Sequence, residues 1–170
     1  MIDMSAPRSP ACSETVMHEL VLPTHTNALG TAFGGTIMSW VDICGAICAQ
    51  RHTSGIVVTA SIDQLDFLAP VRLGDIVRLT ARVSYVGRTS LEVRVIVDVL
   101  NNAYTHEQRA GIAYVSFVAV DDNNARRPVP KLDLSDPRDQ RRFDAGKERR
   151  EHRLAVRDRK AAIAKAEEPI

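Results

Sequence analysis

The sequence predicts an α+β fold in which a curved antiparallel sheet of about five strands wraps around one long central helix, with a charged helix after it. The segment 36–52 contains no proline and carries apolar side chains around nearly its whole circumference, as buried helices do. After Gly55 the pattern changes to runs rich in β-branched residues, separated by short turn segments. A helix and a sheet of this kind bury their apolar surfaces against each other.

The boundaries of the elements follow from local signals. A first strand over 14–22 ends at Pro23, because proline has no N–H to donate to a strand ladder. A loop over 24–35 then leads into the helix. The later strands are expected over 57–67, 75–86, 90–100 and 104–120. Since tight turns separate these runs, we expect an antiparallel meander, and its exposed edge strands favour an oligomer.

We expect three parts in the 170 residues: a disordered leader over 1–12, one domain over 13–134 and a basic helical tail over 135–170. The leader holds prolines and serines but little that it could bury. The tail is dense in Arg, Lys, Asp, Glu and Ala without a continuous apolar stripe, so we expect a largely solvated helix that docks only locally. Gly146 is its candidate break.

The charge of the chain is unevenly distributed. The formal net charge of +1 divides into −4 over residues 1–125 and +5 over residues 126–170. A basic tail can meet a nucleic acid, a membrane surface or a phosphate-bearing ligand. Positive and negative side chains are interspersed along the tail, however, and this pattern favours a solvated helix.

The sequence carries no signal for export or membrane insertion. No stretch approaches the roughly 20 apolar residues of a membrane helix, and the start lacks the charged and apolar regions of a signal peptide. The three cysteines, Cys12, Cys44 and Cys48, are an odd number and predict reduced thiols, two of them buried on the helix. We therefore expect a cytoplasmic protein.

The residues suited to chemistry gather around the start of the long helix. Gly34 and Gly35 place unpaired N–H groups at the positive end of the helix dipole, which outlines an oxyanion hole but also suits a tight turn into the helix. Asp42 lies two turns further in among apolar neighbours, where a carboxylate is costly unless it is paired, hydrogen-bonded or open to a cleft. Asn27 could orient a water or a carbonyl, or it could simply form a turn. Thr59 lies in a predicted strand, where β-branched residues are common without any functional role.

A second candidate site is the turn Gly87-Arg88-Thr89-Ser90. An arginine beside two hydroxyls and turn amides can hold a phosphate group. From these residues alone, a plain hairpin turn is the better interpretation.

Taken together, these motifs resemble the hot-dog-fold acyl-CoA thioesterases, in particular the short bacterial acyl-CoA hydrolases and the cytosolic long-chain acyl-CoA hydrolases of eukaryotes. The resemblance begins with the pattern Asn27-x-x-Gly30-x-x-x-Gly34-Gly35-x-x-Met38-x-x-x-Asp42. It continues through 58–63, 66–71, 74–75, 87–90 and 128–130, and so covers about residues 14–132. It implies hydrolysis of an acyl-CoA to a carboxylic acid and CoA by homodimers that pair their sheets edge to edge, share active sites and assemble further into hexamers.

The resemblance also implies a role for each candidate residue. Asp42 would be the general base or nucleophile, and the partner subunit's Asn27 would place the thioester or a water. The amides of Gly34 and Gly35 would polarise the carbonyl, with Thr59 in support.

Two further implications concern the substrate. Arg88, Thr89 and Ser90, with Arg126 or Arg127, would lie near the nucleotide of CoA. No metal or organic cofactor is required, because a carboxylate, water and backbone donors suffice for acyl transfer and coenzyme A belongs to the substrate and product.

Two other functions are compatible with the sequence. A hot-dog hydratase or dehydratase acting on acyl thioesters would use His25 as its acid-base group. A non-catalytic acyl-CoA sensor would use the basic tail to contact DNA or a protein. No helix-turn-helix signature accompanies the tail, so we expect no nucleic acid as partner. Since no stretch is long and apolar enough for a membrane helix, we expect no membrane as partner either.

Overall fold

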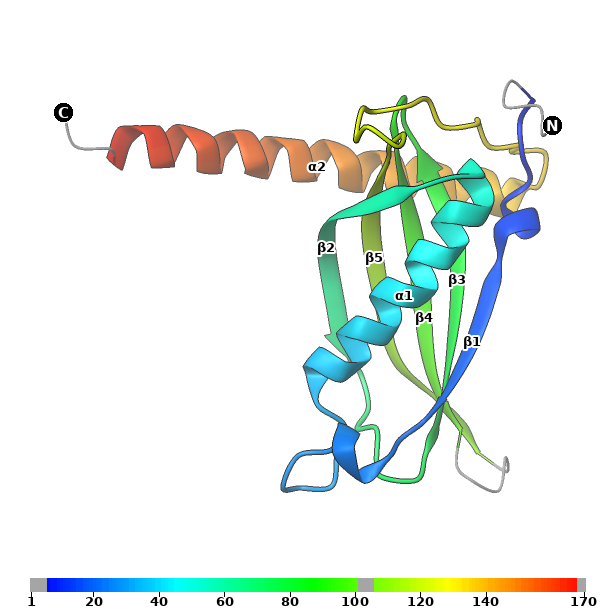
Figure 1. The fold of residues 1–170 in the computed structure, drawn as a ribbon, viewed down its shortest axis with the longest axis vertical. Helices are drawn as coiled ribbons and strands as arrows, with labels where there is room; N and C mark the ends of the chain where they lie inside the picture. The colour runs from blue at the N-terminus through cyan, green and yellow to red at the C-terminus, as the bar shows by residue number, and fades with distance from the viewer. Residues whose placement is uncertain (1–5, 101–105, 168–170) are drawn as a thin grey trace.

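The computed structural model describes residues 6–100 and 106–167. A five-stranded antiparallel sheet curves around helix α1 (Gly34–Thr53), and helix α2 (Pro137–Glu167) packs against the other face of the sheet (Figure 1). The predicted α+β fold, with a curved sheet around a long helix and a second charged helix, is confirmed. The helix α1 includes the glycine pair that was expected just before it.

The strand order differs from the predicted meander. The strands are β1 (Thr15–Leu20), β2 (Val57–Phe67), β3 (Ile76–Val86), β4 (Ser90–Leu100) and β5 (Glu107–Ala119), and two short 3-10 turns, η1 (Pro10–Ser13) and η2 (Pro23–His25), flank β1. They lie in the order β1-β3-β4-β5-β2, so only β3, β4 and β5 form a meander. The reason is that α1 follows β1 and covers the concave face, which sends β2 to the opposite edge. Residues 68–75 then return the chain to β3, beside β1.

The core lies between α1 and the concave face of the sheet. Val41, Cys44 and Cys48 of α1 are fully buried. Gly45 lets the helix approach closely, because a Cβ there would lie 3.2 Å from the ring of Phe117 on β5. The burial of apolar side chains between the helix and the sheet is the main source of stability in a fold of this kind.

The two core cysteines should be chemically silent in the folded protein. Burial raises the pKa of Cys44 to about 11 and that of Cys48 to about 12, whereas Cys12 is exposed. Because the thiolate is the reactive species, a thiol reagent should label one cysteine quickly in the native chain and all three only after denaturation. Cys12→Ser should remove the fast phase. Rapid labelling of three native thiols would contradict this packing.

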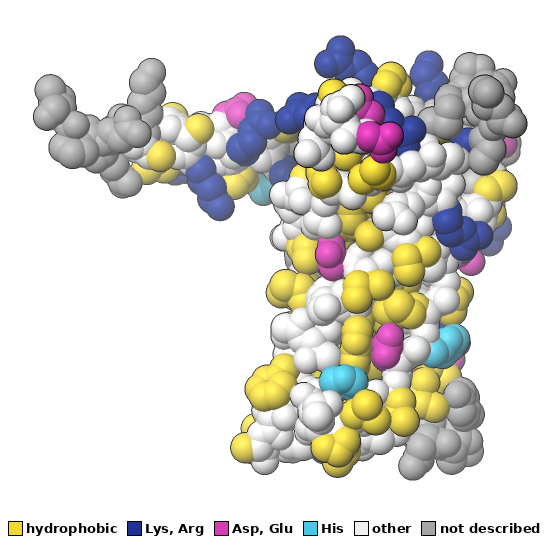
Figure 2. All heavy atoms as spheres, viewed as in Figure 1, with side chains coloured by type: hydrophobic (Ala, Val, Ile, Leu, Met, Phe, Trp, Pro, Cys, Tyr) yellow, Lys and Arg dark blue, Asp and Glu magenta, His cyan; other side chains and the backbone are white. Residues whose placement is uncertain are grey.

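One side of α1 is left uncovered, although its apolar circumference predicted burial all round. Met38, Ile43 and Ile47 are 42%, 47% and 40% exposed. The sheet covers only the opposite side of the helix, and apolar side chains are visible down the front of the domain over α1 (Figure 2). A contiguous apolar surface of this kind is typical of a protein-protein contact.

The N-terminal part of the described chain packs onto the end of α1. The guanidinium of Arg8 donates to the carbonyl of His52, and the Arg8 N–H donates to the carbonyl of Lys131 at 2.8 Å. Residues 6–12, which were predicted to belong to a disordered leader, therefore contact the domain. The physical reason is that carbonyls in the last turn of a helix lack intrahelical partners and accept from a cation.

His52 gives folding a pH dependence. Its ring is buried, Nε2 lies 3.1 Å from the carbonyl oxygen of Pro130, and burial lowers its pKa. The unfolded chain therefore binds a proton at a higher pH than the folded chain, so this contribution to stability is complete above about pH 6.5 and declines below it. The urea midpoint should fall between pH 7.5 and 5.5, and His52→Gln should reduce that fall. An unchanged slope in the variant would contradict this assignment.

Helix α2 is continuous through Gly146, the candidate break. A Cβ at Gly146 would lie 2.7 Å from the Cβ of Tyr85, so glycine here allows the helix to lie directly on β3. The buried carboxylate of Glu92 holds the next turn through Arg149, whose guanidinium also lies 3.8 Å from the centre of the Tyr114 ring. Beyond these contacts α2 projects past the edge of the sheet as an arm (Figure 1).

Candidate active site

Asp42 and Thr59 form a hydrogen-bonded pair between α1 and β2. Thr59 Oγ1 donates to Asp42 Oδ1 at 2.7 Å. Asp42 is half-buried, and its second carboxylate oxygen has no partner among the described residues. One oxygen is thus oriented by the hydroxyl, and the other is open to a water or a thioester carbon.

The start of α1 offers backbone donors. No side chain caps the helix, and the N–H groups of Gly34 and Gly35 donate to no acceptor within the described part of the chain. A Cβ at Gly34 would lie 3.3 Å from the ring of Phe67, whereas Gly35 faces open space. Free amides at the positive end of a helix dipole can stabilise an oxyanion.

These donors and Asp42 of the same chain are separated along the helix. The eight residues from Gly34 to Asp42 correspond to about 12 Å of helix at roughly 1.5 Å per residue. A thioester carbonyl spans far less.

Asn27 is folded into its own loop. Its Oδ1 accepts from the N–H groups of Leu29 and Thr31 at 2.9 and 3.2 Å, and its Nδ2 lies 3.0 Å from Thr31 Oγ1. Gly30, with φ +70°, completes the turn. The structure therefore holds Asn27 rigidly but does not bring it to Asp42 of the same chain.

His25, the acid-base group of the rival hydratase, is also engaged locally. Its Nδ1 accepts from the N–H of Leu22 at 3.2 Å, and its ring meets Trp40 edge-on at 5.1 Å. No carboxylate contacts it among residues 6–100 and 106–167. Nothing in this arrangement would activate the imidazole for proton transfer.

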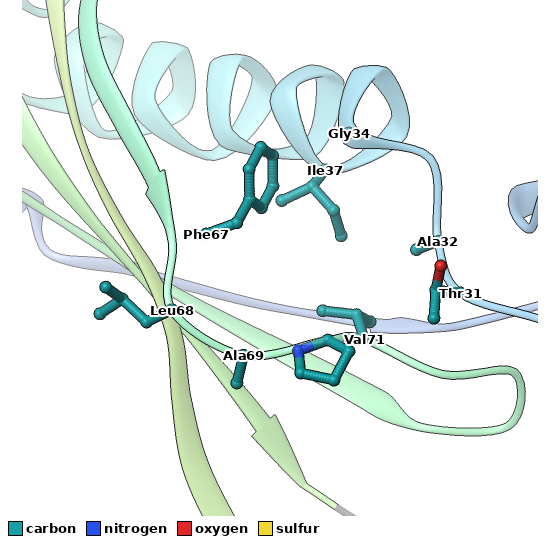
Figure 3. A pocket seen from close by; sticks show the side chains of 9 residues that line it. Thr31, Ala32, Gly34, Ile37, Phe67, Leu68, Ala69 and Val71 are labelled. Atoms are coloured by element: carbon teal, nitrogen blue, oxygen red, sulfur yellow. The ribbon is translucent and has the colours of Figure 1, made fainter. Parts of the chain in front are cut away.

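An apolar cavity of about 450 Å³ opens beside the start of α1 (Figure 3). Ile37 from the helix, Phe67 from the end of β2 and Val71 from the following loop point toward it, and Leu68 also lines it. Gly34 belongs to the same wall. The lining suits an acyl chain ending near the helix amides.

A second cavity, of about 1160 Å³, lies on the other face of the sheet. It is a groove between the arm of α2, the β3–β4 hairpin and strands β2 and β5. Arg88, Thr89, Ser90 and Arg126 all line it. The turn that the sequence analysis singled out and one of the two late arginines thus meet in one place.

Residues 29–102 match the Thioesterase superfamily. The uncharacterised acyl-CoA thioester hydrolase YkhA of Bacillus subtilis is 37% identical over 131 residues, which are 76% of this chain and 76% of the relative. The chain belongs to the acyl-CoA thioester hydrolases. The hot-dog fold of this family is therefore its fold.

Solved members of the family have the same architecture. The acyl-CoA hydrolase of Staphylococcus aureus, solved with butyryl-CoA, CoA and CoA disulfide, is 34% identical with a TM-score of 0.86, over 94% of this chain and 97% of that one. It has also been solved as variants in which one aspartate, one asparagine or one threonine is replaced by alanine. An apo-hexameric acyl-CoA thioesterase is 35% identical with a TM-score of 0.82, over 89% of this chain and 99% of that one.

Arg127 does not join the groove, contrary to the expectation for a CoA contact. Its guanidinium donates to the carbonyl of Thr53 at 2.9 Å and to that of Val120 at 3.2 Å. Its guanidinium is therefore bound to a carbonyl group at the C-terminal end of α1 and to one just after β5, and it does not line the groove. Neighbouring residues of an extended segment point in opposite directions, which separates Arg127 from Arg126.

The groove also contains residues that the sequence analysis did not single out. These are Ser116 on β5 and the basic residues of the α2 arm, among them Arg150 and Lys160. The excess of positive charge after residue 126 was a signal for the arm, although its direction could not be read from the sequence. Nothing in the sequence around Ser116 indicated that it would line this groove.

Among the residues that the structure describes, no three His, Cys, Asp or Glu side chains come together as a metal site. None of the helices in that part of the chain is both long and apolar enough to pass through a lipid bilayer.

Proposed function

We propose that this chain hydrolyses the thioester of an acyl-CoA to a carboxylic acid and CoA, with Asp42 as the general base or nucleophile. The observation that carries the proposal is the Asp42–Thr59 hydrogen bond of 2.7 Å, which leaves one carboxylate oxygen open at the edge of the sheet. Family membership supports the reaction class.

The chemistry follows from these groups. As a base, the free oxygen of Asp42 takes a proton from water while the water oxygen bonds to the thioester carbon. Negative charge then moves to the carbonyl oxygen, where the N–H groups of Gly34 and Gly35 stabilise it. When the carbon–sulfur bond breaks, the CoA thiolate leaves and receives the proton.

As a nucleophile, Asp42 would instead attack the carbon directly and form a mixed anhydride that water then hydrolyses. A single turnover in oxygen-18 water distinguishes the two routes. Direct attack followed by hydrolysis at the Asp42 carbonyl of the anhydride leaves one labelled oxygen in Asp42, whereas water attack on the thioester leaves the label only in the product acid.

A related hydrolase supports the same set of residues. The asparagine, aspartate and threonine replaced in the Staphylococcus aureus variants are spaced 15 and 17 residues apart, as are Asn27, Asp42 and Thr59 here. We assign Thr59 the orientation of Asp42, and the partner subunit's Asn27 the placement of the thioester or water.

The active unit in this proposal is a homodimer. The amides at the start of α1 lie about 12 Å from Asp42 along the same helix, so the partner subunit must supply one of the two groups. The uncovered face of α1 and the edge strand β2, which carries Thr59, offer the surface for that contact. Hexameric relatives support a further assembly of dimers.

The two cavities suit the two ends of the substrate. The apolar cavity beside Gly34 would hold the acyl chain, and the groove lined by Arg88, Thr89, Ser90 and Arg126 would hold the nucleotide of CoA. No metal or organic cofactor takes part in the proposed steps.

The test is the release of free thiol from a series of acyl-CoAs of increasing chain length, with product acids identified by mass spectrometry. We expect turnover that yields acid and CoA in equal amounts. Binding of acyl-CoA without turnover would favour a sensor instead. Addition of water to an enoyl-CoA with the thioester intact would favour a hydratase.

A further inference from the structure

The groove on the outer face of the sheet has a second wall, the arm of α2, that no part of the proposed mechanism yet uses. We propose that this arm is a specificity element for the phosphates of CoA, with Arg150 and Lys160 binding the nucleotide opposite the β3–β4 hairpin. The inference rests on the proposed function and extends it to a segment outside the family motifs.

The lining of the groove is strongly basic. Seven cations line the groove, but only Asp63 and Glu148 are acidic. Asp63 is already engaged by Arg153 and by the hydroxyl of Ser61. The groove thus holds an excess of positive charge in a confined space, which an anionic ligand would neutralise.

The cations of the groove differ in whether they have carboxylate partners. Arg149 and Arg153 hold α2 on the sheet through Glu92, and Arg157 pairs with Asp158. Within the described residues, Arg150 and Lys160 contact no carboxylate, and neither do Arg88 and Arg126 across the groove. The cations divide into those that fix the arm and those left available to a ligand.

The position of Arg150 links the arm to the hairpin. Its Nε lies 3.8 Å from the place where a Cβ on Gly87 would stand. The guanidinium therefore lies over the turn that carries the hydroxyls of Thr89 and Ser90. An arginine above two hydroxyls and turn amides is suited to a phosphate group.

The groove also leads toward the proposed catalytic pair. Ala60 lines it at a register shift in the pairing of β2 with β5, and the preceding residue, Thr59, bonds to Asp42. A ligand with phosphates in the groove and a long flexible arm could pass the edge of β2 at this bulge. Acyl-CoA has that form.

The experiment compares two substrates on one set of variants. Arg150→Gln should raise the KM for an acyl-CoA about tenfold, the loss expected for one charge-assisted hydrogen bond, without changing kcat. The KM for the corresponding acyl-pantetheine, which lacks the nucleotide, should not change. Arg150→Lys should restore part of the affinity.

Arg159→Gln is the matched control, because Arg159 is an exposed cation of the same helix that does not line the groove. An equal effect in Arg150→Gln and Arg159→Gln would overturn the proposal, since net charge alone would then explain it. So would an equal effect of Arg150→Gln on both substrates, because that would indicate a structural role.

A binding measurement separates this inference from the proposed function. Calorimetry with adenosine 3′,5′-bisphosphate should show binding to the wild-type chain and weaker binding to Arg150→Gln. If neither thioester is hydrolysed but this difference is found, the reaction is wrong and the phosphate site stands. Equal binding to both chains would refute the phosphate site whatever the turnover.

Discussion

Replacing Asp42 by Asn is expected to lower kcat for acyl-CoA hydrolysis by about 100- to 10,000-fold, the usual contribution of a general base. Asparagine has nearly the same shape and can still accept from the Thr59 hydroxyl, so the fold should be kept. Its amide, however, can neither take a proton from water nor attack the thioester carbon. Steady-state kinetics with thiol detection measure the effect.

The control for this variant is Asp122→Asn, because Asp122 is exposed in the turn after β5 and far along the chain from the site. Thr59→Val should reduce kcat less than Asp42→Asn does, since it removes the orienting hydroxyl but leaves the carboxylate. Wild-type turnover by Asp42→Asn would mean that Asp42 is a structural carboxylate. A lower melting temperature without a kinetic effect would point the same way.

Replacing Ile47 by Arg should produce a monomer with essentially no turnover. Ile47 is 40% exposed on the uncovered face of α1, and a guanidinium there would have to be desolvated when two subunits meet. Asp42 lies on the same helix but more than one turn away, so its bond to Thr59 should persist. Because the proposed site combines the helix amides of one subunit with Asp42 of the other, loss of the partner should remove activity.

Light scattering and the thiol-release assay, run on the same samples, test this expectation. Ile163→Arg is the control, because Ile163 is 49% exposed on the α2 arm and lies outside the proposed contact. A monomeric Ile47→Arg chain with wild-type turnover would show that one subunit contains a complete site. The two-subunit mechanism would then be wrong.

The elements of this protein could be predicted closely because their signals are local. The strands β2 and β4 begin and end where alternation and turn residues placed them, and β3 differs by one residue at its start. Around the site, the Asn27 to Asp42 motif predicted a glycine pair at the start of the helix and a carboxylate within it. Both features depend on neighbours in the sequence, so the sequence was sufficient to place them.

Other features depend on contacts between distant segments. Strand β2 pairs with β5 and not with β3, because α1 separates β1 from β2 across the sheet. Residues 6–12 pack on the domain because Arg8 reaches the end of a helix more than 40 residues away. Turn and strand patterns contain no information about such partners.

The sequence by itself determined the fold class, the helix that carries Asp42 and the hairpin that carries Arg88, since periodicity and turn chemistry decide these locally. Only the tertiary structure decided that Thr59 bonds to Asp42 and that the basic tail faces the hairpin. It also decided that Arg126 lines the groove whereas Arg127 binds the end of α1. The physical reason is that a side chain's partner depends on strand order and on the close contact of Gly146 with β3. These are properties of the packed molecule, and composition and spacing do not specify them.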